Sequence, residues 1–228
     1  MSQRLRRIFS EYKSLLLFFG LMLVFRSAVA DWMYVPTGSM NPTIVEGDRI
    51  LVDKFAYGLR VPFTEIRLTE GHDPQRGDIV IFPSPEDGMV LVKRVVGLPG
   101  DVVEMRDEQL LVNGVAIDYA PTDEAADADL LAVTRQEHRY YLNETLGQEQ
   151  HPIMVLPNRY AMRSFGPTTV PAGKFFMLGD SRDNSKDSRY FGFVPRRSIV
   201  GRAYRVAYSL NSDHWYFPRS DRFMSALR

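Results

Sequence analysis

The sequence predicts a mainly β fold that follows a single N-terminal transmembrane helix, and three observations support this class. Several short apolar runs are each bounded by Gly, Pro or Asp, as strands usually are. Asn113-Gly114 separates two such runs, which is a strong signal for a two-residue β-hairpin. Helical periodicity is weak beyond the N-terminal apolar segment. The strands that these patterns predict are 49–53, 78–82, 89–96, 109–112, 174–178 and 199–208.

The N-terminal segment predicts a membrane anchor. Residues 1–13 contain four basic side chains and one acidic one, whereas residues 14–30 contain a single charge, Arg26. This apolar stretch is close to the lower limit of roughly 17–25 residues for a spanning helix. Because positive flanks stay in the cytoplasm, we expect the N-terminus there, the rest of the chain outside, and Trp32 and Tyr34 at the membrane interface.

A second interpretation of the same segment stays open. A basic start, an apolar core and Ala28-Val29-Ala30 before Asp31 also resemble a cleavable signal peptide. Arg26 interrupts the region between the apolar core and that cleavage point. The position of this charge favours the uncleaved anchor.

Lys93 is the residue that ordinary packing explains least. It interrupts the apolar run 89–96, and in a strand it would share its face with Leu91 and Val95. Burial can lower the pKa of a lysine by about 3–5 from its ordinary value of about 10.4. A lysine on an apolar face can therefore act as a general base near neutral pH. The structural alternative is a lysine that extends its amine to water at the edge of a sheet.

Ser39 is the candidate nucleophile that such a base would serve. It lies in the turn-rich segment Pro36-Thr37-Gly38-Ser39-Met40-Asn41-Pro42-Thr43. A serine in such a loop is often only a turn residue. A hydroxyl on a loop and a lysine in an apolar strand are nevertheless the two parts of a serine–lysine hydrolase.

Four segments in this order resemble the type I signal peptidases, membrane-bound serine proteases that remove signal peptides from exported precursors. The matching segments are 36–43, 47–52, 76–82 continued by 91–101, and 179–192. The resemblance implies that the partners are signal peptides and the lipid bilayer, and that the catalytic domain lies on the periplasmic side of the inner membrane. It also implies a main domain formed by 31–106 and 169–228, with a smaller lobe, 107–168, inserted between them.

The resemblance assigns roles to individual residues. It makes Ser39 the nucleophile and Lys93 its general base. Thr37, with the backbone N–H of Ser39, falls where the family has its oxyanion hole. Ser185 matches a serine that orients the lysine amine.

Two further groups of residues are assigned in the same way. Asp187 and Arg189 match a structural ion pair near the site. Another set matches positions that line shallow pockets for small side chains, as in Ala-X-Ala cleavage sites; its members are Val35, Pro36, Met40, Ile44, Leu91 and Val92. These apolar residues could equally be core residues, and several could be both.

Composition limits the alternatives. The acids in 179–192 lack the spacing of a calcium loop, so we expect no metal and no cofactor. The four histidines lie outside every matching segment, which argues against a Ser-His-Asp triad. There is no cysteine, and the 28 basic and 28 acidic residues leave no footprint for nucleic acid. Two other classes stay open: a serine–lysine maturation peptidase of a conjugation system, and a non-enzymatic, membrane-tethered β domain.

Overall fold

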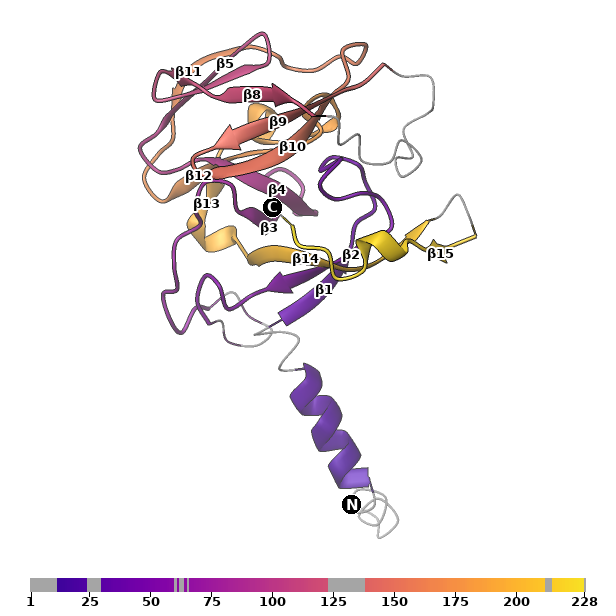
Figure 1. The fold of residues 1–228 in the computed structure, drawn as a ribbon. Coiled ribbons are helices and arrows are strands. Elements are labelled where there is room, and N and C mark those ends of the chain that lie inside the picture. Colours follow the sequence, from indigo (N-terminus) through magenta and orange to yellow (C-terminus); the bar gives the residue numbers. More distant parts are fainter. Residues whose placement is uncertain are drawn as a thin grey trace.

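The computed structural model describes residues 12–23, 30–59, 61, 64, 66–122, 138–211 and 215–227. Figure 1 shows a β-rich body and one N-terminal helix. The predicted mainly β class is confirmed. Three predicted features lie outside the described residues: the basic segment up to residue 11, the part of the anchor at 24–29 with Arg26, and residues 123–137 of the inserted lobe.

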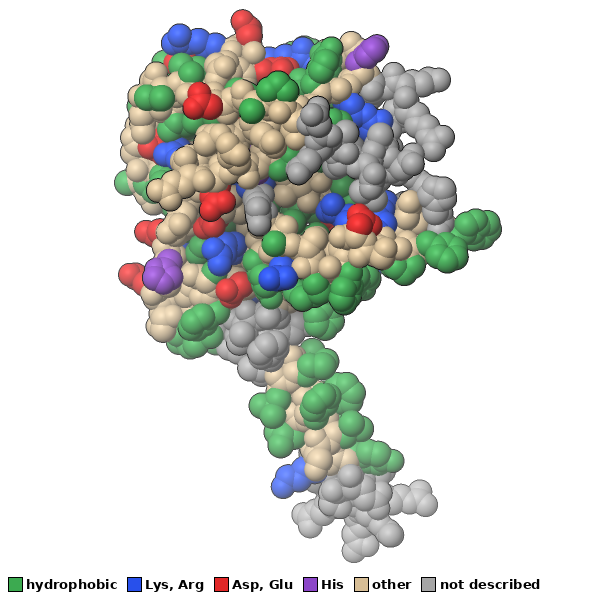
Figure 2. All heavy atoms as spheres, viewed as in Figure 1, with side chains coloured by type: hydrophobic (Ala, Val, Ile, Leu, Met, Phe, Trp, Pro, Cys, Tyr) green, Lys and Arg blue, Asp and Glu red, His purple; other side chains and the backbone are tan. Residues whose placement is uncertain are grey.

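The N-terminal helix covers residues 12–23, and all its side chains are exposed. Most of these side chains are large and apolar, as the green surface of the helix in Figure 2 shows. In the part of the chain that the structure describes, no helix is both long and apolar enough to cross a membrane. The first strand begins at Ala30, a residue that the predicted anchor includes.

The largest sheet has eight strands in the order β1-β2-β14-β3-β4-β12-β13, with β15 paired to β14. Its strands are β1 (Ala30–Tyr34), β2 (Asp48–Asp53), β3 (Ile79–Pro83), β4 (Val90–Gly97), β12 (Lys174–Leu178), β13 (Val194–Pro195), β14 (Gly201–Asn211) and β15 (Phe217–Pro218). All its neighbouring strands run antiparallel. The strand β14 lies between β2 and β3, so the C-terminal part of the chain completes the sheet.

Two smaller sheets lie at the end of the body that is farther from the N-terminal helix in Figure 1. One has the order β11-β5-β6-β7 and the other the order β10-β9-β8. Their strands are β5 (Val102–Arg106), β6 (Gln109–Val112), β7 (Val115–Ala116), β8 (Asp118–Pro121), β9 (Tyr140–Leu146), β10 (Glu149–Val155) and β11 (Phe165–Thr169). The short helices are η1 (Arg182–Asn184), α2 (Ser188–Phe191), η2 (Arg196–Ser198) and η4 (Ser220–Arg222).

The strands predicted from apolar patterns are present with boundaries shifted by a few residues at most. The predicted hairpin is also present, because β6 and β7 pair antiparallel across Asn113-Gly114. Asn113 and Gly114 have φ angles of 54° and 76°. Positive φ at both central residues is what a type I′ turn requires, and it explains the choice of these two residues.

Candidate active site

The segment that carries Ser39 connects β1 to β2. It is held by short-range backbone bonds, from Asn41 N to Gly38 O (3.1 Å) and from Ile44 N to Met40 O (2.9 Å). A third bond reaches it from the distant 179–192 segment: Ser181 N donates to the carbonyl oxygen of Ser39 (3.2 Å). The nucleophile candidate is therefore fixed at its main chain and not only by its side chain.

Lys93 lies on β4, next to Val80 of β3, and only 2% of it is exposed. Its Nζ lies 2.7 Å from Ser39 Oγ and 3.0 Å from the carbonyl oxygen of Val92. Either Nζ or Oγ can donate the bond between them, depending on whether the lysine is protonated. The fold thus joins two side chains that are 54 positions apart in the sequence.

Burial lowers the pKa of Lys93 from 10.5 to about 8. The negative charges of Asp187 and Asp180 raise this pKa and so oppose the effect of burial, whereas Arg189 lowers it further. A substantial fraction of Lys93 is consequently neutral near pH 8. A serine hydroxyl beside a buried, partly neutral lysine is suited to nucleophilic attack with lysine as the base.

Arg94, the neighbour of Lys93, forms a buried ion pair that the sequence analysis missed. Its Nε lies 2.8 Å from Asp180 Oδ1, and its Nη2 lies 2.7 Å from Asp180 Oδ2. The side chains of both residues are 1% exposed. Asp180 also accepts a bond from Thr43 Oγ1 (2.5 Å), so it links the lysine strand to the segment after the nucleophile. The available signal was a second charged residue, directly after Lys93, in a strand whose other residues are apolar or glycine, because a buried arginine needs an acidic partner.

Asp187 and Arg189 lie together as a buried pair. Arg189 Nε donates to Asp187 Oδ1 and Arg189 Nη2 to Asp187 Oδ2, both at 2.8 Å. Asp187 also accepts a bond from the backbone N–H of Gly179 (3.1 Å), at the start of the 179–192 segment. This carboxylate therefore fixes the turn that leads from β12 toward Ser39.

Ser185 is 7% exposed, and in the described part of the chain its Oγ has no hydrogen-bond partner. The bond to Lys93 that the family resemblance implies is thus not formed in this structure. Gly179 lies between the side chain of Ser185 and the main chain of Ser39. A Cβ at Gly179 would lie 2.2 Å from Ser185 Oγ and 2.4 Å from the carbonyl oxygen of Ser39, so only glycine fits there.

The other predicted site residues lie around Ser39 and β4. Thr37 and Pro36 are exposed on the loop. Four of the predicted pocket residues share one apolar cluster: Val35, Met40 and Ile44 are buried in it, and Val92 packs against it. Leu91 packs against a different cluster, which contains Val95. The face shared by Leu91, Lys93 and Val95 is therefore apolar, as predicted.

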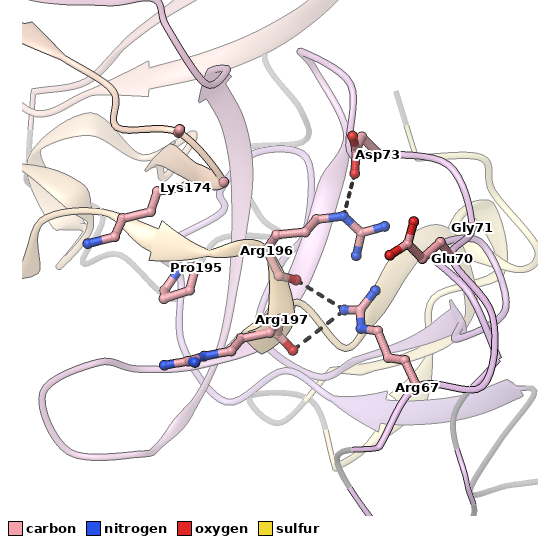
Figure 3. Close-up of a pocket in the computed structure, with 10 residues that line it drawn as sticks. Arg67, Glu70, Gly71, Asp73, Lys174, Pro195, Arg196 and Arg197 are labelled. Carbon is pink, nitrogen blue, oxygen red and sulfur yellow. Dashed lines mark hydrogen bonds and ion pairs between the residues drawn. The ribbon is translucent and has the colours of Figure 1, made fainter.

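A cavity of about 670 Å³ lies elsewhere, and none of the predicted site residues lines it. Figure 3 shows that two of its arginines, Arg67 and Arg196, bond to neighbouring segments of the chain. Arg67 donates to the carbonyl oxygens of Arg196 (3.0 Å) and Ile199 (2.9 Å), and Arg196 pairs with Asp73 (2.7 Å). These contacts attach the loop before β3 to η2, which explains the arginines as structural.

Most of this chain is similar in sequence to known proteins. The family model described as signal peptidase, peptidase S26, matches residues 8–208. Signal peptidase I of Pseudomonas aeruginosa is 41% identical over 198 residues, which cover 82% of this chain and 67% of that protein. Signal peptidase I of Rickettsia typhi is 33% identical over 220 residues, covering 90% of this chain and 82% of that protein. A crystal structure of a signal peptidase I from Enterococcus faecalis V583 is 38% identical and covers 57% of this chain and 97% of that one, at a TM-score of 0.35.

Matches of this extent define the class as a serine endopeptidase of the S26 type. The chain belongs to the signal peptidase family, peptidase S26, and removes signal peptides from precursor proteins. The identification drawn from the four sequence segments is confirmed. The same finding favours an enzyme over the non-enzymatic β domain.

Proposed function

We propose that Ser39 is the nucleophile of this peptidase and Lys93 its general base. The observation that carries the proposal is the distance of 2.7 Å between Lys93 Nζ and Ser39 Oγ, with the lysine buried. The neutral amine accepts the hydroxyl proton as Oγ attacks the scissile carbonyl carbon. It then donates that proton to the leaving amine, which departs with the mature protein. Attack by water on the acyl-enzyme, assisted by the same amine, restores Ser39 and releases the signal peptide.

The negative charge of the tetrahedral intermediate needs donors that are in place before the reaction. The hydroxyl of Thr37 and the backbone N–H of Ser39 are the proposed donors, and the loop position of Thr37, two residues before the nucleophile, supports the choice. Removing one such donor typically reduces turnover on the order of 100–1,000-fold. Thr37→Val, which keeps the shape and removes the donor, is the matching variant.

Ser185 is proposed to orient the lysine during turnover. Its buried Oγ has no hydrogen-bond partner in the described part of the chain, which leaves it available to accept a bond from Nζ after a small side-chain rotation. Ser185→Ala should lower kcat on the order of 100-fold with KM nearly unchanged, because a misplaced base slows chemistry more than binding. Wild-type kcat in this variant would show that packing alone holds Lys93.

The substrate is proposed to be a precursor with small residues at the cleavage site, of the Ala-X-Ala kind. The apolar cluster that contains Val35, Met40 and Ile44, with Val92 packed against it, supports this choice, because Met40 and Val92 directly adjoin Ser39 and Lys93 in the chain and an apolar surface favours methyl groups. Pro36 and Leu91 would complete the pocket. Replacing the alanine nearest the scissile bond by leucine should abolish cleavage.

The enzyme is proposed to be anchored in the inner membrane by residues 14–30, with its catalytic domain on the periplasmic side. The exposed apolar side chains of helix 12–23 support this topology. Hydrophobic side chains also gather on the surface in Figure 2 where β15 lies in Figure 1. Phe217, at the start of β15, and Trp215, just before it, are largely exposed. The eight-residue path from Asp31 to Ser39 spans at most about 28 Å, so the dyad would stay near the bilayer surface. A mature N-terminus at Asp31, found by mass measurement, would refute the anchor.

The division of the periplasmic part is also a proposal. Residues 31–106 and 169–228 would form the catalytic domain, and 107–168 the smaller lobe. The separate β10-β9-β8 sheet supports this division. Limited proteolysis that cuts between residues 107 and 168 and leaves the rest resistant is the expected result.

The dyad is tested with purified full-length variants and a precursor that has an Ala-X-Ala site. Ser39→Ala and Lys93→Ala should each abolish cleavage, and the double variant should be no worse, because the two groups act as a unit. Lys93→Arg should also fail, because arginine keeps its proton. Lys174→Ala, at an exposed lysine, is the matched control and should retain activity. Near-normal turnover by Lys93→Ala would refute the dyad.

A further inference from the structure

The β10-β9-β8 sheet has no role in the proposed mechanism, yet it contacts the segment that holds the nucleophile. We propose that this sheet is a positioning element of the active site and that Glu144 on β9 is its principal positioning residue. The proposal rests on the proposed dyad, because it concerns how Ser39 and Lys93 are held. It gives a function to a part of the chain whose role the sequence left unassigned.

The edge strand β10 and the residues after it are joined to the segment 180–184 by main-chain and side-chain bonds. Met154 N donates to the carbonyl oxygen of Asp180 (2.9 Å), and the two segments form a parallel bridge at Met154 and Ser181. Leu156 N donates to Asp183 Oδ2 (2.7 Å), in a fully buried bond. The sheet therefore extends by one bridge onto the turn that follows β12.

Glu144 adds a charged contact to the same turn. Its side chain is completely buried, and Oε2 pairs with Nη2 of the buried Arg182 at 2.5 Å. Tyr119 of β8 donates its hydroxyl to Glu144 Oε1 (2.8 Å), and His151 Nε2 of β10 lies 3.1 Å from Oε2. All three strands of the sheet thus contribute a side chain to one polar cluster around this carboxylate.

Glu144 stays ionised in this environment. Burial alone would raise its pKa, but Arg182 and His151 together outweigh burial and hold the pKa well below the ordinary value. For His151 the pKa is lowered, first by burial and then by the charge of Arg94. A buried ion pair of this kind is weak evidence for stability, because apolar residues of similar size often do as well. The contribution of this ion pair is to geometry. Because several bonds fix both charged side chains, the turn that carries Arg182 can adopt few arrangements.

The turn that Glu144 holds contacts Ser39 itself and Arg94, the residue next to Lys93 on β4. Ser181 N donates to the carbonyl oxygen of Ser39, and Arg182 Nε donates to the carbonyl oxygen of Gly179 at 3.3 Å. Asp180 pairs with Arg94, the neighbour of Lys93. A shift of this turn would displace the nucleophile and the base relative to each other. Displacements of about 1 Å can reduce turnover on the order of 100-fold.

The main test is Glu144→Gln in the full-length enzyme, because it keeps the shape and removes the charge. We expect kcat on a precursor peptide to fall on the order of 10–100-fold while KM stays within about twofold. Leu146→Ala is the matched control: Leu146 lies two residues further along β9 and is buried in an apolar cluster that contains neither Ser39 nor any residue of 180–184. It should lower the denaturation midpoint but keep the wild-type kcat below that midpoint.

A second variant separates positioning from stability. Glu144→Met with Arg182→Met replaces the ion pair by apolar side chains and should recover the denaturation midpoint without recovering kcat. Recovery of kcat together with the midpoint would overturn the positioning role. The same conclusion would follow if Glu144→Gln kept the wild-type kcat while Ser39→Ala was inactive. An active Ser39→Ala would instead refute the dyad itself, so the two failures are distinguishable.

Discussion

Replacing Lys93 by methionine should inactivate the enzyme and at the same time stabilise its fold. Methionine has nearly the length of lysine and no charge, so it fills the same apolar space beside β3. The wild-type protein must bury an amine that is protonated at neutral pH, and methionine removes that requirement. A residue retained for catalysis at the expense of stability should behave in this way.

The magnitude follows from the lysine pKa. Burial lowers the pKa of Lys93 from 10.5 to about 8. At about 1.4 kcal/mol for each pH unit, this difference corresponds to about 3 kcal/mol of destabilisation wherever the lysine is charged in both states, that is below pH 8. The Lys93→Met variant would also leave Ser39 Oγ without the bond from Nζ, which costs about 1 kcal/mol. The expected net gain at pH 7 is therefore about 2 kcal/mol.

The sign of the pH dependence is fixed by linkage. Between pH 8 and 10.5 the unfolded wild-type chain binds more protons at Lys93 than the folded chain, so the stability of the wild type rises with pH in this window. Lys93→Met lacks this rise. The gain of about 2 kcal/mol at pH 7 should therefore disappear, and reverse to a loss of about 1 kcal/mol, above pH 10.5.

The assay is urea unfolding of the detergent-solubilised protein at pH 7, 9 and 11, followed by intrinsic fluorescence. Lys174→Met, at an exposed lysine, is the control and should show no change of this kind. A difference in the free energy of unfolding between Lys93→Met and wild type that stays constant from pH 7 to 11 would refute the reasoning. So would a variant that is less stable than wild type at pH 7.

Three further predictions concern the same site and its surroundings. First, kcat/KM should rise with pH and level off above about pH 8, because the lowered pKa of Lys93 sets the fraction of neutral base; a rise centred near 10.5 in the pH–rate profile would contradict this. Second, Gly179→Ala should reduce kcat at least about 100-fold in peptide cleavage assays, because its Cβ would lie 2.4 Å from the carbonyl oxygen of Ser39 and displace it; unchanged kcat would mean that the turn yields elsewhere. Third, Arg222→Gln should lower the free energy of unfolding by about 3 kcal/mol in urea titrations, because Arg222 makes two bonds to the fully buried Asp48; a loss below about 1 kcal/mol would show that this pair is not structural.

The sequence allowed prediction of those strands whose burial follows from apolar side chains. The strands β3 and β12 are nearly continuous apolar runs, and β6 was recognisable from the turn beside it. The strand β1 was not predicted, because its Trp32 and Tyr34 follow the apolar anchor and were assigned to the membrane interface. In the structure these residues pair with β2, and both remain about half exposed.

The strands β9 and β10 were missed for a different reason. Their buried positions include Glu144 and His151, so the alternation of apolar and polar residues that marks a strand is absent. Charged residues at buried positions are recognisable only when their partners are known, and Arg182 lies 38 positions away. Ser39 and Lys93 were accessible from sequence because each is unusual in its own local context. Their contact was inferred from the family resemblance and not from spacing.

The central position of β14 determines when activity can first appear during synthesis. The strand β2, which follows Ser39, is separated from β3 and from the Lys93 strand β4 by β14. The strand β12 lies on the other side of β4. A growing chain that ends before residue 174 lacks both strands and also lacks the turn that holds the carbonyl oxygen of Ser39. If Ser39 and Lys93 form the dyad as proposed, we expect peptidase activity only after β12, the turn that follows it and β14 have been made.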